Sequence, residues 1–166
     1  MTVFVIMGVS GAGKTTVGTQ VSQRLGLPFF EGDSFHPQAN IDKMSSGTPL
    51  TDADRVPWID ALTGGINHRE DPKRDAIVAC SALSRFVRQR IRERMQEPVE
   101  FILLHTDASL IEDRLSKRAT HYMKAGMLGS QLAALQMPRS AYCVDVSRPL
   151  DEVIAEVTDY ISRKEQ

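Results

Sequence analysis

The sequence predicts an α/β protein in which helices cover both faces of a parallel β-sheet. Short apolar runs rich in Val, Ile and Phe alternate with longer segments of helical spacing, a pattern typical of strands joined by crossover helices. The chain has 166 residues, of which 42% are hydrophobic and 25% charged. This size and balance suit one folded domain, so we treat residues 1–166 as a single domain.

Five apolar runs are predicted to be strands. TVFVIM is a continuous run rich in β-branched residues, which indicates a strand buried on both faces. The predicted strands are 2–7, 28–33, 75–80, 99–105 and 142–146. Ligands of open parallel sheets bind beyond the carboxyl ends of the strands, so functional residues are expected just after each run.

The segments between these runs are predicted to be helices. Thr51 and Asp54 have the spacing of a capping box, which starts one helix, and Gly47 ends the helix before it. The arginine-rich segment 84–95 is amphipathic and is expected to expose most of its charges. The predicted helices are 14–25, 36–46, 51–66, 84–95, 107–118 and 150–164.

Composition excludes several classes of protein. The formal net charge is −1, so no overall field attracts nucleic acid or an anionic membrane. No run approaches the roughly 18 apolar residues of a membrane-spanning helix, and MTVFVIMG is too short for a signal peptide. Cys80 and Cys143 lie in apolar runs and are expected to be buried, reduced thiols. We expect a cytoplasmic protein with a small-molecule substrate.

The segment MGVSGAGKTT, residues 7–16, contains the pattern G-x-x-x-x-G-K-[ST] from Gly8 to Thr15. It lies between a predicted strand and a predicted helix, the context of a P-loop, and it indicates a three-layer P-loop NTPase-type fold. Backbone N–H groups and the helix N-terminus bind phosphates, Lys14 adds a cation, and the Thr15 hydroxyl is a suitable Mg²⁺ ligand. The alternative is a glycine-rich turn with a solvated lysine. The predicted nucleotide-binding residues here are Gly8, Ser10, Gly11, Ala12, Gly13, Lys14, Thr15 and Thr16.

The rest of the chain favours a small-molecule kinase among P-loop proteins. The sequence has no N-K-x-D segment that would read guanine, and no Walker B aspartate follows DAIVAC. Asp33 lies at the carboxyl end of the second predicted strand, where a carboxylate can accept the proton of a substrate hydroxyl as a general base. The alternative for Asp33 is an aspartate that caps a turn.

Several segments resemble the gluconokinase family of shikimate-kinase-like P-loop kinases. They are the P-loop, EGDSFHPQANIDKMSSGTPLTDADRVPW (31–58), CSAL (80–83), RLSKRATHYM and SQLAALQ within 114–136. The resemblance implies ATP-dependent phosphorylation of D-gluconate at its 6-hydroxyl, a requirement for Mg²⁺, a homodimer, and the parallel sheet order 2-3-1-4-5. One departure is the short connection MPRSAY, where the family carries a longer segment against the adenine; Arg139 is a candidate there.

Under this resemblance, the segment of about 33–58 binds the sugar acid. Arg55 can hold a carboxylate with a bidentate pair of hydrogen bonds. His36, Asn40 and Lys43 fall at i, i+4 and i+7, so a helix would carry all three on one face of the pocket. The alternative places Arg55 in a surface ion pair and His36 at a helix cap.

Further candidates follow the third strand. Ser81 stands at the carboxyl end of that strand, where its hydroxyl would bind the substrate or would simply cap a helix. Arg85 is the arginine of its segment nearest the predicted site. Cys80, Met44 and Trp58 are expected to pack in the core.

The segment RLSKRATHYMKAGML is expected to contain a lid at about 118–130 that closes over ATP and excludes water. Arg118 is assigned to the phosphates as a third catalytic residue beside Lys14 and Asp33, because lid arginines offset charge on the transferred group. Arg114 is assigned to the adenine side, and His121 to the substrate and the ordering of the lid. The alternative is an exposed helix end that favours cations.

Two other functions remain open at this point. One is a related kinase that acts on shikimate or another small hydroxy acid. The other is a nucleotide-binding regulatory module that keeps the fold without catalysis.

Overall fold

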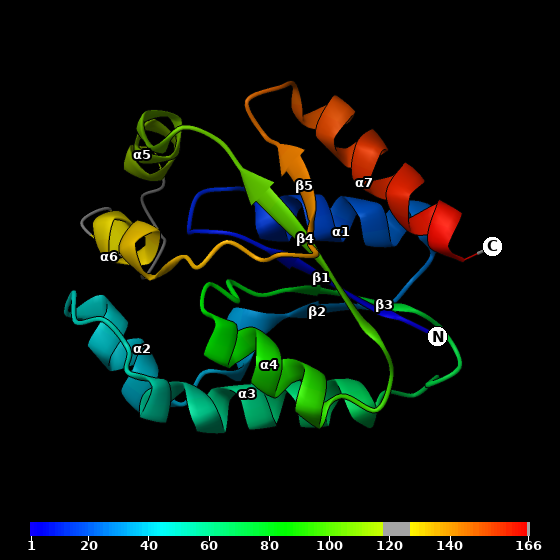
Figure 1. Cartoon of the computed structure of the whole chain (residues 1–166), viewed down its shortest axis with the longest axis horizontal. Coiled ribbons are helices and arrows are strands. Elements are labelled where there is room, and N and C mark those ends of the chain that lie inside the picture. Colours follow the sequence, from blue (N-terminus) through cyan, green and yellow to red (C-terminus); the bar gives the residue numbers. More distant parts are fainter. Residues whose placement is uncertain (118–126, 166) are drawn as a thin grey trace.

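The chain folds around a five-stranded parallel sheet with the order β2-β3-β1-β4-β5 (Figure 1). The structure is a computed structural model that describes residues 1–117 and 127–165. Every strand pair is parallel, which confirms both the α/β class and the sheet order. The strands are β1 (Val3–Met7), β2 (Phe29–Glu31), β3 (Ala76–Ala79), β4 (Val99–His105) and β5 (Tyr142–Asp145).

Helices cover both faces of the sheet and make three layers (Figure 1). They are α1 (Lys14–Leu25), α2 (Gln38–Ser45), α3 (Asp52–Asn67), α4 (Arg85–Arg94), α5 (Ala108–Ser116), α6 (Met127–Ala134) and α7 (Leu150–Lys164), with a 3₁₀ turn η1 (Gly32–Phe35). Side chains of β1 alternate between the two layers: Val5 packs in one core with α3 and α4, and Phe4 and Ile6 pack in another with α1 and α7. The β1 side chains are fully buried because both faces are covered.

The predicted helix boundaries hold where the sequence carries local capping signals. Both hydrogen bonds of the capping box are present: Asp54 N–H donates to Thr51 Oγ1 at 3.2 Å, and Thr51 N–H donates to Asp54 Oδ2 at 2.9 Å. The helices α1 and α7 have the predicted ends. The turn η1 was not predicted.

The helix predicted from residue 36 begins two residues later, at Gln38. Pro37 explains the shift, because a proline disfavours helical backbone angles in the residue before it. His36 accordingly has an extended conformation, with φ −66° and ψ 132°. The prediction that His36 shares a helix face with Asn40 and Lys43 is therefore wrong for His36.

The two cysteines differ in exposure. Cys80 is buried, and burial raises the pKa of its thiol to about 12, so it is the packed residue that was expected. Cys143 is exposed, contrary to the prediction. It lies on β5, the edge strand next to β4, where alternate side chains are left uncovered.

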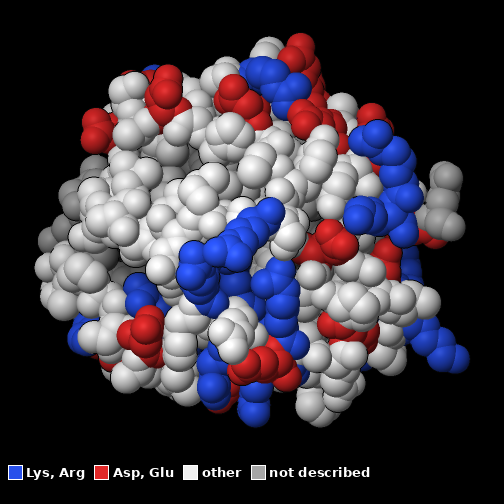
Figure 2. All heavy atoms as spheres, in the orientation of Figure 1, with Lys and Arg blue, Asp and Glu red and all other residues white. Residues whose placement is uncertain are grey.

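Figure 2 shows Lys and Arg side chains gathered over the region of α4, with acidic side chains beside them. Arg85, Arg92 and Arg94 are exposed, as expected for a solvated face, but Arg88 is only 3% exposed. In the part of the chain that the structure describes, no helix is long and apolar enough to cross a membrane.

Candidate functional site

The P-loop connects the end of β1 to the start of α1. Gly8 has φ +147°, and a Cβ atom at this position would lie 2.7 Å from the Leu104 carbonyl oxygen, so only glycine fits. Gly13 has φ +96° and is the N-cap of α1, with no side-chain cap from the described residues. The first N–H groups of α1 therefore form an anion-binding helix N-terminus.

Two side chains at the start of α1 contact the loop and the end of β2. Lys14 Nζ donates a hydrogen bond to the Val9 carbonyl at 3.0 Å, which brings its ammonium group back over the loop. The Thr15 hydroxyl donates to the Glu31 carboxylate, and the other Glu31 oxygen accepts the Asp33 N–H at 3.3 Å. A hydroxyl and a carboxylate side by side at a phosphate-binding loop are the hard oxygen ligands that Mg²⁺ prefers, so these residues fit that ion.

Sequence reasoning missed Glu31. It is the last residue of β2, at the carboxyl end of the sheet where functional residues were expected. The sequence signal for Glu31 was weak, because the predicted strand ran to residue 33 and placed Glu31 inside it.

One cavity of about 250 Å³ joins the P-loop to the predicted acceptor segment. Asp33 reaches it from η1, His36 from the residues just after η1, and Arg55 from the first turn of α3. Ser81 reaches it from the loop after β3, next to the P-loop, where the Ser81 carbonyl accepts the Gly8 N–H at 3.2 Å. The P-loop residues in the wall are Ser10, Gly11, Gly13, Lys14 and Thr15. Segments far apart in sequence thus converge on one space.

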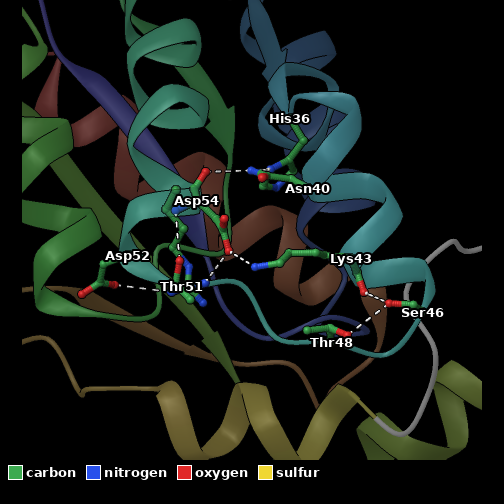
Figure 3. A network of polar contacts seen from close by, with 9 residues as sticks. His36, Asn40, Lys43, Ser46, Thr48, Thr51, Asp52 and Asp54 are labelled. Atoms are coloured by element: carbon green, nitrogen blue, oxygen red, sulfur yellow. Dashed lines mark hydrogen bonds and ion pairs between the residues drawn. The ribbon is translucent and has the colours of Figure 1, made fainter.

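Three predicted substrate residues do not line this cavity. Lys43 Nζ donates to Asp54 Oδ2 at 2.7 Å, and this bond is the main reason why the pKa of Asp54 is lowered to about 2 (Figure 3). Asn40 is buried and donates to the Asp54 carbonyl at 2.9 Å. Arg85 starts α4, where its backbone N–H donates to Gln136 Oε1 at 2.8 Å. These residues join segments around the site.

His36 is buried against Trp58 at the edge of the cavity. Its side chain is 4% exposed, and its ring stacks on the Trp58 ring with a centroid distance of 4.2 Å and an interplanar angle of 16°. Burial lowers the pKa of His36 to about 4; Asp33 opposes this shift and Arg55 adds to it. The imidazole is therefore neutral near pH 7. Trp58 is a core residue, as expected, and also forms part of the cavity wall.

Arg55 is the positively charged residue in the part of the cavity that the predicted sugar-acid segment lines. Its guanidinium lies 3.4 Å from Asp52 Oδ1, and 24% of its side chain is exposed. A weak, partly solvated ion pair of this kind contributes little stability, so the guanidinium is available to a carboxylate ligand.

A second hollow lies on the other side of the P-loop, beside Gly11–Gly13 and Thr16. Arg114 lines it and donates to the Val146 carbonyl at 2.7 Å, and Arg148 and Leu150 complete its wall. Besides Arg114 and the P-loop, the wall of this hollow includes residues from the loop after β5 and the start of α7. Arg139 does not line it.

Two predicted lid residues, Arg118 and His121, lie outside the described residues. The described part of the predicted lid, 127–130, forms the first half of α6. Ser130 and Gln131 of α6 line the main cavity, and the side-chain carbonyl of Gln131 accepts the Ser10 N–H at 2.6 Å. Sequence analysis did not single out these two residues.

Comparisons with known proteins agree with the fold and with the family that the sequence resembles. The model of the AAA domain family matches residues 3–138. A gluconokinase from Gluconobacter oxydans is 46% identical over 134 residues, covering 81% of this chain and 75% of the relative. The thermoresistant gluconokinase of Escherichia coli is 38% identical over 165 residues, covering 97% of this chain and 94% of the relative. A crystal structure of a gluconokinase from Sinorhizobium meliloti has a TM-score of 0.78 and 38% identity, covering 98% of this chain and 97% of that one.

The fold and the nucleotide loop define a P-loop kinase, a class of phosphotransferase that binds ATP. Within that class, the family is identified by the sequence identity to gluconokinases over nearly the full length of the chain. The chain belongs to the gluconokinase family.

Proposed function

We propose that this chain transfers the γ-phosphoryl group of ATP to the 6-hydroxyl of D-gluconate. The observation that carries the proposal is the shared cavity, in which the P-loop, Asp33 and Arg55 face one another. Those groups supply a phosphate cradle, a base and a cation for a carboxylate. This set matches a substrate that is both an alcohol and an acid.

The P-loop, Gly8–Thr15, holds the triphosphate. Loop N–H groups at the start of α1 and the ammonium group of Lys14 bind its oxygens, and Arg114, which lines the second hollow, is assigned to the adenine side. Thr15 and Glu31 would hold Mg²⁺, which when bound neutralises phosphate charge.

Asp33 orients the 6-hydroxyl and accepts its proton as the oxygen attacks the γ-phosphorus. The transfer is direct and in line, so no phosphoenzyme forms. Arg55 fixes the carboxylate end of gluconate, and Ser81 binds one of its hydroxyl groups.

The lid of about 118–130 closes over the complex in this proposal. Arg118 offsets charge on the transferred group, and His121 contacts the substrate side. Closure excludes water, which would otherwise accept the phosphoryl group.

Two further assignments complete the proposal: the family resemblance implies the oligomeric state, and the composition predicts the location. We assign a homodimer, tested by light scattering coupled to gel filtration, and a cytoplasmic location, tested by cell fractionation. A monomer at micromolar concentration would contradict the first, and an enzyme recovered outside the cytoplasm would contradict the second.

A panel of acceptors tests the function. ADP release is measured with ATP, Mg²⁺ and either D-gluconate, idonate, shikimate or glucose, and ³¹P NMR identifies the product. We expect D-gluconate to give the highest kcat/KM and a phosphate monoester at the primary alcohol. Faster turnover with shikimate would favour a related hydroxy-acid kinase, and no stimulation by any acid would favour a non-catalytic module.

A further inference from the structure

A buried amide determines which ring nitrogen of His36 carries the proton. Asn40 is 3% exposed, and its Nδ2 lies 2.9 Å from the Asp54 carbonyl oxygen and 3.2 Å from His36 Nδ1 (Figure 3). A carbonyl oxygen only accepts hydrogen bonds, so the Asn40 atom that faces it is the amide nitrogen. That nitrogen only donates, so His36 Nδ1 is an acceptor and has no proton.

The proton of the neutral His36 ring is therefore on Nε2. Burial keeps the ring neutral near pH 7, because it lowers the pKa of His36 to about 4. Nε2 lies 4.0 Å from Asp33 Oδ1, and the stack on Trp58 holds the ring plane. The site thus pairs a fixed N–H donor with a carboxylate acceptor.

The gap between these two groups suits one oxygen atom. A distance of 4.0 Å is too long for a direct hydrogen bond. An oxygen about 2.8 Å from each group would accept from Nε2–H and donate its own proton to the carboxylate. A hydroxyl group does both at once, and both His36 and Asp33 line the cavity.

We propose that His36 and Asp33 Oδ1 together bind one hydroxyl group of the sugar acid, and that Asn40 is a positioning residue that fixes His36 as the donor. The inference rests on the proposed function, because it takes D-gluconate as the acceptor. The second oxygen of Asp33 remains for the hydroxyl that receives the phosphoryl group. The site therefore selects acceptors with two neighbouring hydroxyl groups.

Two substitutions of His36 separate donation from other roles. The amide nitrogen of glutamine reaches the position of Nε2, whereas that of asparagine reaches only the position of Nδ1. We expect His36→Gln to keep kcat/KM for gluconate within about fivefold of the wild type. His36→Asn is expected to lose about tenfold or more, mainly through KM for gluconate, with KM for ATP unchanged in both. Gln38→Ala, at an exposed position of α2, is the control.

Wild-type activity in both His36 variants would overturn the donor role, because donation at Nε2 would then not be needed. Equally large losses in both would also overturn it, because the hydrogen bond that glutamine donates would then be insufficient.

Asn40→Ala tests the positioning role in two backgrounds. In the wild type we expect about a tenfold loss of kcat/KM, because the ring is then free to adopt the other tautomer. In the His36→Gln background we expect less than a twofold loss, because an amide has no tautomer. The same loss in both backgrounds would mean that Asn40 only supports the fold, and would overturn the proposal.

A spectroscopic measurement on the wild type tests the tautomer directly, because it requires neither a folded variant nor catalytic turnover. ¹⁵N NMR of the wild-type imidazole at pH 7 is expected to show Nε2 protonated and Nδ1 unprotonated for His36. The opposite tautomer, or a charged ring, would overturn the inference. Failure of the proposed function is distinct from this, since it would appear as no gluconate-dependent ADP release by the wild type.

Discussion

The side-chain carbonyl of Gln131 accepts a hydrogen bond from the backbone N–H of Ser10 at 2.6 Å, although the two residues are 121 positions apart. The contact links α6 to the P-loop at a loop position where phosphate oxygens are expected to bind. A polar side chain of α6 thus contacts the P-loop directly.

Charge at position 131 is predicted to control affinity for ATP. Gln131→Glu places an anion against the phosphate-binding loop, and we expect the KM for ATP to rise about tenfold, because like charges repel. Gln131→Ala removes the side chain without adding charge and is expected to stay within about threefold. Steady-state kinetics with ATP varied at saturating gluconate measure both. Equal KM values for the two variants would contradict a phosphate beside Ser10.

Arg55 is predicted to determine selection for an acid. Arg55→Met removes a bidentate, charge-assisted contact, so the KM for gluconate should rise roughly 10- to 100-fold while kcat changes little. Arg55→Lys is expected to recover part of the loss. Arg85→Met is the matched control, because Arg85 carries the same charge and does not line the cavity. An unchanged KM in Arg55→Met would remove the carboxylate assignment.

His36 is predicted to make the fold sensitive to acid. Its pKa falls from the ordinary 6.5 to about 4 in the folded chain because the ring is buried. Between pH 6.5 and 4 the unfolded chain therefore binds a proton at His36 that the folded chain does not. The contribution of the neutral ring to the free energy of unfolding is complete above pH 6.5 and is lost as the pH falls toward 4.

Urea unfolding at a series of pH values measures this effect. The midpoint for the wild type should fall between pH 6.5 and 4 more steeply than that for His36→Gln, which cannot titrate there. Identical slopes would contradict a buried neutral ring at this position.

Arg88 is predicted to be the arginine of α4 that matters for stability. It is 3% exposed, and its Nη1 donates to the Ala82 and Leu83 carbonyls at 2.8 Å each. Its Nη2 donates to the Gln136 carbonyl at 2.6 Å, so these hydrogen bonds join the loop after β3 to the segment just after α6. Ala82, whose carbonyl is one of these acceptors, has φ +46°.

Arg88→Met should lower the free energy of unfolding by about 3 kcal/mol, because three buried carbonyls lose their donor. Arg92→Met on the same helix is the control, since Arg92 is exposed and lies over the Phe101 ring. It is expected to change the unfolding free energy by less than about 1 kcal/mol. Similar losses in both variants would mean that α4 responds to charge alone.

The sequence was sufficient to predict those features of the fold and the site that depend on residues close together in the chain. The P-loop was located from eight consecutive positions between a strand and a helix, and the capping box from Thr51 and Asp54. The order of the strands came from family resemblance rather than from periodicity. The element boundary at Pro37 was also local, but helical spacing was given more weight than the proline.

The rest depends on contacts between distant segments. Lys43 was assigned to the substrate from helical spacing, which does not reveal its partner Asp54 in the next helix, 11 positions on. Arg88 was grouped with its exposed neighbours because its three acceptors are backbone carbonyls, which no residue type reveals. Gln131 could be placed at the P-loop only after the chain had folded.

The most direct test of the central claim is the turnover of Asp33→Asn, measured together with ATP affinity. Asparagine keeps the shape of the side chain but cannot accept the proton of the acceptor hydroxyl. We predict that kcat with D-gluconate falls about 100-fold or more, while the Kd for ATP, measured by calorimetry with Mg²⁺, stays within about twofold. Turnover equal to that of the wild type would contradict Asp33 as the base, and with it the mechanism.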